Sequence, residues 1–175
     1  GADRNTVILF TSDNGMFFGE RGLSDCWLLY EESLRVPLLI RDPRRRLRGA
    51  VREEMVLNLD LAPTLLDLAG IEKEKIPPVD GRSLLPLLEK ESGGDWRDDF
   101  LCEHLFKHRQ IPRSEGVRTR RWKYIRYIDQ VPVREELYDL NADPTERENL
   151  SGEAKYADRL RELRARCAVL IRGAG

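Results

Sequence analysis

Two short apolar segments near the start of the chain constrain the fold most strongly. The run "TVILFTSDNG" is rich in β-branched and aromatic residues and ends in Ser, Asp, Asn and Gly, and "RVPLLIRDP" repeats this pattern. Each predicts a buried strand that runs into a loop. We expect the two strands to lie parallel at the edge of an α/β sheet. Because two buried parallel strands do not make a stable sheet alone, residues 1 to about 50 are predicted to be the end of something larger.

Three helices are expected before residue 95. The polar, glycine-rich connection between the two strands is predicted to carry a short helix from about Leu23 to Ser33. In "LNLDLAPTLLDLAG", leucines recur at helical spacing and Gly70 ends the helix. The segment "RSLLPLLEKE" predicts a brief helix that Pro86 breaks.

The character of the chain changes near residue 95. Three later segments predict strands of an antiparallel sheet: "DDFLCEHLF", "EGVRTRRWKYIRYI" and "EELYDL". The final segment predicts an amphipathic helix whose apolar face holds Tyr156, Leu160, Leu163, Cys167 and Leu170. We therefore divide the chain into residues 1–94, part of an α/β domain, and residues 95–175, a small α+β subdomain whose antiparallel sheet is packed by the C-terminal helix.

Charge and cysteine content narrow the classes of partner. The 30 basic residues nearly cancel the 31 acidic ones, leaving a formal net charge of -1. This balance gives no electrostatic reason to expect nucleic acid or a membrane surface as a partner. No apolar run approaches the roughly 20 residues that span a bilayer. The three cysteines are widely spaced without a CxxC pair, which argues against a disulfide framework or a zinc site.

Asp13 and Asn14 follow the first predicted strand directly. In α/β sheets, ligands gather at the carboxyl ends of strands. A carboxylate beside an amide oxygen offers the hard donors that Ca²⁺ and Mg²⁺ prefer. An Asp-Asn-Gly sequence is more often a simple turn, so both interpretations stand. Because Ca²⁺ takes six to eight oxygen ligands, most of the ligands would have to come from elsewhere.

The sequence resembles the type I sulfatases of the alkaline-phosphatase-like superfamily. The resemblance covers nearly the whole chain, and its motifs occur in the same order as in that family. The matching motifs are "FTSDNG", "GERGLSDCWLLYEESLRVPLLIRDP", "LNLDLAPTLLDLAGI", "VDGRSLLPLL", "GVRTRRWKYIRY" and "ELYDLNADPTERENL". The resemblance implies an α/β fold, formed by the end of a mixed sheet with a small C-terminal subdomain. It also implies a parent enzyme that hydrolyses sulfate monoesters of a small molecule or carbohydrate, in a periplasmic, extracellular or lysosomal-type compartment.

The resemblance also implies a metal and a nucleophile. Asp13 and Asn14 match the later pair of Ca²⁺ ligands of such enzymes, whose other carboxylates lie near their N-terminus. The nucleophile is a formylglycine made from the Cys or Ser of a C/S-x-P-x-R motif. That motif is absent, because Trp-Leu follows Cys26, Glu-His follows Cys102 and Ala-Val follows Cys167. We therefore expect the chain alone to hold a partial Ca²⁺ site and to be inactive.

Position 26 departs from the resemblance. Similar sulfatases carry a lysine there that contacts the sulfate, and a thiol does not replace a fixed positive charge. Three explanations stay open: weakened or altered activity in this member, a compensating base such as Arg21, or an inactive paralogue. Glu103 and His104 also match residues that reach the substrate pocket in such enzymes, although a structural role for the histidine is equally compatible.

Alternative functions follow from the same residues. A phosphodiesterase or phosphonate hydrolase of the superfamily also uses Asp-rich metal sites. A pseudoenzyme or a non-catalytic binding or scaffolding module is the other alternative, given Cys26 and the absent nucleophile. Should the rest of a larger protein normally cover residues 1–50, their strands would be exposed here, and a dimer through this sheet edge is then expected.

Overall fold

The structure, a computed structural model, describes residues 2–45, 49–72, 77–89 and 95–174. Their contacts define two compact units: Gly1–Asp13 with Pro37–Arg97, and Asn14–Val36 with Asp98–Gly175. The segment 14–36 thus packs with the C-terminal part of the chain. The division into domains at residue 94 stays a prediction. Within the described residues, none of the helices has the length and apolar character needed to cross a membrane.

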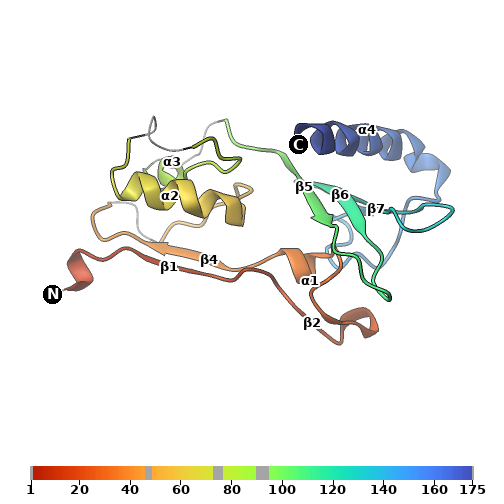
Figure 1. Cartoon of the computed structure of the whole chain (residues 1–175), viewed down its shortest axis with the longest axis horizontal. Coiled ribbons are helices and arrows are strands. Elements are labelled where there is room, and N and C mark those ends of the chain that lie inside the picture. Colours follow the sequence, from red (N-terminus) through yellow and green to blue (C-terminus); the bar gives the residue numbers. More distant parts are fainter. Residues whose placement is uncertain (1, 46–48, 73–76, 90–94, 175) are drawn as a thin grey trace. The chain divides into compact units, whose positions relative to one another are not determined.

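The first unit is built around a pair of strands (Figure 1). Its elements in order are η1 Ala2–Arg4, β1 Ile8–Thr11, β4 Leu38–Arg41, η3 Asn58–Asp60, α2 Leu61–Leu68 and α3 Leu85–Glu89. Strands β1 and β4 are antiparallel, with Phe10 opposite Leu39, so the predicted parallel pairing is wrong. An apolar run carries no signal for the direction of a strand, and no long helix lies between β1 and β4 to return the chain for a parallel pairing.

The two faces of this strand pair differ in burial. Leu38 and Ile40 pack against a small core of Leu84, Leu87 and Trp96. On the other face, Phe10 and Leu39 are exposed.

A buried aspartate organises the helices of the first unit. The Asp60 carboxylate accepts hydrogen bonds from the main-chain N–H groups of Leu57 (2.8 Å) and Arg82 (2.7 Å), and from the Arg97 guanidinium (2.7 Å). Helix α2 ends before Gly70, whose φ of 72° is left-handed, as predicted. Pro86 lies in the first turn of α3, where its missing N–H costs no hydrogen bond. Pro86 is therefore the second residue of this helix, and the prediction that it breaks the helix is wrong.

The second unit contains the predicted antiparallel sheet. Its strands are β5 Asp99–His104, β6 Ser114–Thr119, β7 Trp122–Tyr127 and β8 Arg134–Asp139, paired in that order. After η5 Ala154–Tyr156, helix α4 Ala157–Gly173 packs on β5, β6 and β7 (Figure 1). The core on this side joins Leu160, Leu163 and Cys167 of the helix to Val117, Tyr124 and Leu137 of the sheet. The predicted helix face and sheet are thereby confirmed.

Segment 14–36 covers the opposite face of the same sheet. It holds β2 Phe17–Phe18, η2 Glu20–Gly22, β3 Ser24–Asp25 and α1 Glu31–Leu34. The helix predicted for residues 23–33 is thus reduced to four residues, because a small β2–β3 hairpin occupies the earlier part. Phe17, Leu29 and Tyr30 pack against sheet residues that include Ile125 and Tyr138.

A buried lysine fastens this segment to the sheet. Lys123 of β7 has no exposed surface, and its Nζ lies 2.7 Å from Glu31 Oε1 and 2.7 Å from Glu146 Oε1. The second oxygen of Glu31 lies 3.2 Å from the Arg118 guanidinium. The second oxygen of Glu146 accepts the main-chain N–H of Glu31 at 2.7 Å. The start of α1, the sheet and the turn at residue 146 are therefore joined through one ammonium group.

The two carboxyls of this cluster titrate differently. Burial acts to raise the pKa of each, because the charged form loses its hydration. At Glu31, Lys123 and Arg118 together outweigh burial, and the pKa is lowered. At Glu146, burial outweighs Lys123, and the pKa is raised.

Replacing Lys123 with methionine is expected to lower the free energy of unfolding of the chain by about 3–5 kcal/mol. The substitution keeps an unbranched side chain of similar length but removes the nearest cation of the buried Glu146 and one of the two cations beside Glu31. Urea denaturation followed by circular dichroism measures the change.

Lys155→Met is the matched control, because Lys155 pairs with Glu153 in an exposed position. It is expected to leave the urea midpoint unchanged. Equal midpoints for Lys123→Met and the original chain would refute the importance of the buried cluster.

Candidate functional site

The predicted metal ligands lie where the chain passes from the first unit to the second. Asp13 is exposed; its carboxylate accepts a hydrogen bond from Ser12 Oγ (3.2 Å), and its main-chain oxygen accepts one from Asn58 Nδ2 (2.7 Å). Asn14 Nδ2 donates to the Gly15 carbonyl at 2.7 Å. Gly15 is required here, since a Cβ would lie 2.1 Å from the Glu32 carbonyl oxygen.

The donors at these two positions fit Ca²⁺ in kind but not in number. A carboxylate and an amide oxygen are both hard ligands. Within the ranges that the structure describes, no three His, Cys, Asp or Glu side chains come together as a metal site. Two side chains supply too few of the six to eight oxygens that Ca²⁺ takes.

The Arg21 guanidinium is directed at the main chain of a neighbouring turn. It donates to the carbonyl oxygen of Glu146 at 2.6 Å and also to that of Thr145. It lies over the Tyr30 ring, 4.0 Å from its centroid. Arg21 itself has a left-handed φ of 57°. In this arrangement its charge orders the loop that leads to position 26, and a substrate contact by Arg21 stays a prediction.

Cys26 is held in place through its main chain. Its N–H donates to Asp25 Oδ1 at 2.9 Å, and its carbonyl oxygen accepts a hydrogen bond from Ser33 Oγ. The thiol is half-buried, whereas Cys102 and Cys167 are buried in the two cores of the second unit.

Glu103 and His104 lie on opposite faces of the sheet, because successive side chains of a strand alternate. Glu103 is opposite Glu115 on the face that α4 covers, and burial, with Glu115, raises the pKa of its carboxyl. His104 lies on the other face, with its ring 5.5 Å from that of Trp27. Burial, with His108, lowers the pKa of His104. Of the two, only His104 shares a face with segment 14–36.

Sequence reasoning missed the aromatic residues beside these positions. Trp27 follows Cys26, and Phe106 lies two residues after His104; their ring centroids are 5.9 Å apart. The signal was present, because two large aromatic side chains flanked residues already singled out. Nothing in the order of the sequence showed that the two would meet.

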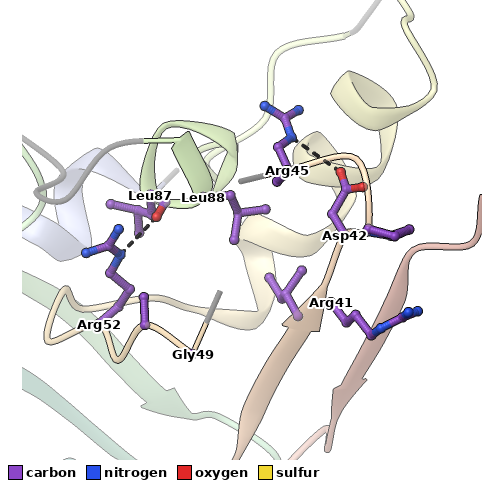
Figure 2. A pocket seen from close by; sticks show the side chains of 10 residues that line it. Arg41, Asp42, Arg45, Gly49, Arg52, Leu87 and Leu88 are labelled. Atoms are coloured by element: carbon purple, nitrogen blue, oxygen red, sulfur yellow. Dashed lines mark hydrogen bonds and ion pairs between the residues drawn. The ribbon is translucent and has the colours of Figure 1, made fainter. Parts of the chain in front are cut away.

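A separate hollow of about 360 Å³ lies in the first unit, between the loop after β4 and α3 (Figure 2). Its arginines contact the protein itself: Arg52 Nε donates to the Leu87 carbonyl (2.9 Å), and Arg45 pairs with Asp42 (3.3 Å). Arg44, with a smaller contribution from Arg45, lowers the pKa of Asp42 to about 2. The Arg52 contact holds the loop that follows β4 against α3, and the Arg45–Asp42 pair lies within that loop.

Comparison with known proteins defines first the class and then the family. A solved structure described as a complex with its substrate D-glucosamine-2-N,6-O-disulfate superposes with a TM-score of 0.85 at 36% identity, covering 97% of this chain and 34% of that one. The phosphonate monoester hydrolase of Agrobacterium radiobacter gives 0.85 at 28% identity, covering 99% and 36%. The fold is thus that of the alkaline-phosphatase-like hydrolases. Residues 19–172 match the family described as N-sulphoglucosamine sulphohydrolase, C-terminal, and the chain belongs to it.

Curated relatives include sulfatases of several kinds. The N-acetylglucosamine-6-O-sulfatase of Bacteroides thetaiotaomicron is 39% identical over 91% of this chain and 29% of its own length. The choline-sulfatase of Rhizobium meliloti is 39% identical over 84% of this chain and 27% of its own length. The chain therefore spans less than a third of either relative.

The three thiols are expected to react at very different rates. Burial raises the pKa of Cys102 to about 12 and that of Cys167 to about 11, so neither forms thiolate at pH 8. Cys26 is the most accessible of the three and should react first with a disulfide reagent such as DTNB.

One thiol per folded chain should therefore react rapidly, and three after denaturation in urea. Cys26→Ser should remove the rapid phase. A rapid phase that survives this substitution would show that one of the core cysteines is accessible.

Proposed function

We propose that this chain forms one wall of the active site of a sulfatase that hydrolyses the sulfate monoester of a carbohydrate. The family match over residues 19–172 carries this proposal. The choice of a carbohydrate is supported by the N-acetylglucosamine-6-O-sulfatase among the relatives and by the sulfated glucosamine named with a superposed structure.

Asp13 and Asn14 are proposed as two ligands of a Ca²⁺ ion whose other ligands lie outside this chain. Their oxygens suit that ion, and Asn14 is followed by a glycine whose N–H bonds to the Ser33 carbonyl at 2.8 Å. When bound, the ion would neutralise negative charge on the sulfate group. This chain contributes by holding the backbone of Asp13 and Asn14 in a fixed position.

The substrate contacts proposed for this chain are His104, Arg21 and Glu103. Support is strongest for His104, because it lies on the same side of the sheet as segment 14–36 and its lowered pKa keeps it neutral at pH 7. A neutral imidazole both donates and accepts, which suits a sugar hydroxyl. Cys26 supplies no positive charge to the sulfate. The enzyme is therefore proposed to turn over more slowly than one with lysine at position 26. A dimer through the β1–β4 edge stays a prediction.

The 175-residue chain alone is expected to show no hydrolysis of 4-nitrophenyl sulfate in the presence of Ca²⁺, because it encodes no C/S-x-P-x-R motif. Calorimetry should find Ca²⁺ binding weaker than micromolar, since most carboxylate ligands are missing. Absorbance of the released nitrophenol measures turnover against a sample without protein.

Turnover above that background would show that the nucleophile has been misplaced. In the full-length enzyme containing this chain, release of sulfate from N-acetylglucosamine 6-sulfate tests the proposed reaction. Hydrolysis of a phosphonate monoester without release of sulfate would favour the phosphonate hydrolase alternative.

Replacing Cys26 with lysine in the full-length enzyme is expected to raise kcat for sulfate release by about tenfold or more. The added ammonium would meet charge that develops on the sulfate and the leaving oxygen in the transition state. Initial rates at saturating substrate provide the measurement.

Cys26→Ser is the matched control, because it changes the side chain without adding charge, and it should leave kcat within about twofold. An unchanged or lower kcat for Cys26→Lys would mean that position 26 does not face the sulfate.

A further inference from the structure

A second hollow, of about 390 Å³, lies wholly within the second unit. The loop after β5 and the end of the β2–β3 hairpin form it. Its walls combine the rings of Trp27 and Phe106 with polar groups from Ser24, Asp25, His108 and Gln110.

The two aromatic side chains stack on each other, and part of each stays accessible. Their rings are inclined by 30°, and 38% of Trp27 and 62% of Phe106 is exposed. Behind them, His104 meets the Trp27 ring edge-on, at 71°, which limits how far the indole can tilt. Large apolar surfaces that gather at one hollow mark a binding site more often than isolated ones do.

The polar groups lie at the rim of the same surface. Hydrogen bonds from the side chains of Trp27 and Cys26, with a smaller contribution from the Cys26 N–H, lower the pKa of the Asp25 carboxyl. Asp25 therefore stays ionised and fixes the indole in place. Ser24 and Gln110 add neutral hydrogen-bonding groups. Accessible aromatic rings with a few converging polar groups are the usual composition of a small-molecule site.

We propose that the hollow lined by Trp27 and Phe106 is a subsite for a saccharide ring. One face of a pyranose carries C–H groups that pack on aromatic rings, while its hydroxyls project from the edge toward polar groups such as Asp25 and Gln110. A quaternary ammonium group would instead favour aromatic faces arranged as a cage. The assignment rests on the proposed function for the choice of a sugar and extends it, because it names the residues that hold the ring.

Binding of a neutral sugar to the 175-residue chain tests the subsite. Saturation-transfer NMR with N-acetylglucosamine, without sulfate, should show millimolar binding, with the ring C–H protons receiving most of the transfer. Phe106→Ala should weaken this binding by about fivefold or more, because it removes half of the aromatic surface. Trp27→Phe keeps an aromatic ring and should weaken it less.

Phe18→Ala is the matched control. Phe18 is an 83% exposed aromatic residue of β2, in the same unit, and it does not line the hollow. It should leave sugar binding within about twofold of the original chain. Circular dichroism of every variant identifies any loss of folding, and Trp27→Phe supplies a second variant should Phe106→Ala unfold.

Absence of transfer to the sugar, or equal affinities for the original chain and folded Phe106→Ala, would overturn the subsite. Binding of choline in preference to the sugar would also overturn it. In the full-length enzyme, Phe106→Ala should raise KM with kcat nearly unchanged. If the full-length Phe106→Ala enzyme releases sulfate with an unaltered KM, the subsite alone is refuted. If the 175-residue chain binds the sugar but the full-length enzyme releases no sulfate, the proposed reaction alone is refuted.

Discussion

The contact between Lys123 and two glutamates fastens segment 14–36 to the sheet of the second unit. Segment 14–36 carries Asn14, Arg21 and Cys26, yet its regular structure amounts to short strands and single helical turns. Such a segment does not hold its shape through its own backbone hydrogen bonds. It is held because Glu31 shares the buried Lys123 ammonium with Glu146. Buried charges are costly unless all partners are present, so this cluster favours one arrangement of the segment over its alternatives.

A second buried carboxylate supports the same segment. Glu136 of β8 is completely buried and accepts hydrogen bonds from the hydroxyls of Tyr30 (2.8 Å), Tyr138 (3.0 Å) and Tyr127 (3.3 Å). Burial, with Glu136, raises the pKa of Tyr127 and Tyr138, so both remain donors at any physiological pH. These three tyrosines therefore combine apolar packing in the core with hydrogen bonds to a buried carboxylate.

The sequence predicted features that depend on residues close together along the chain better than features that depend on residues far apart along it. The C-terminal sheet and helix were predictable, because each buries its own periodic face, as Leu160, Leu163 and Cys167 illustrate. Asp13 and Asn14 were identified from their place after a strand. The direction of β1 relative to β4 was not predictable, since apolar strands carry no directional signal. The pairing of Glu31 with Lys123 and the meeting of Trp27 with Phe106 depend on contacts between distant segments, which no local pattern encodes.

The bond between the Glu31 main chain and Glu146 has a consequence for how the protein is made. The two residues are separated by 115 positions, so segment 14–36 leaves the ribosome well before Glu146 has been synthesised. Until the turn at Glu146 emerges, Lys123 and Glu31 lack the third member of their cluster, and Phe17 and Tyr30 have no complete sheet to cover. The segment bearing Cys26 therefore becomes ordered only after the turn at Glu146, 115 residues further along the chain than Glu31, has been synthesised.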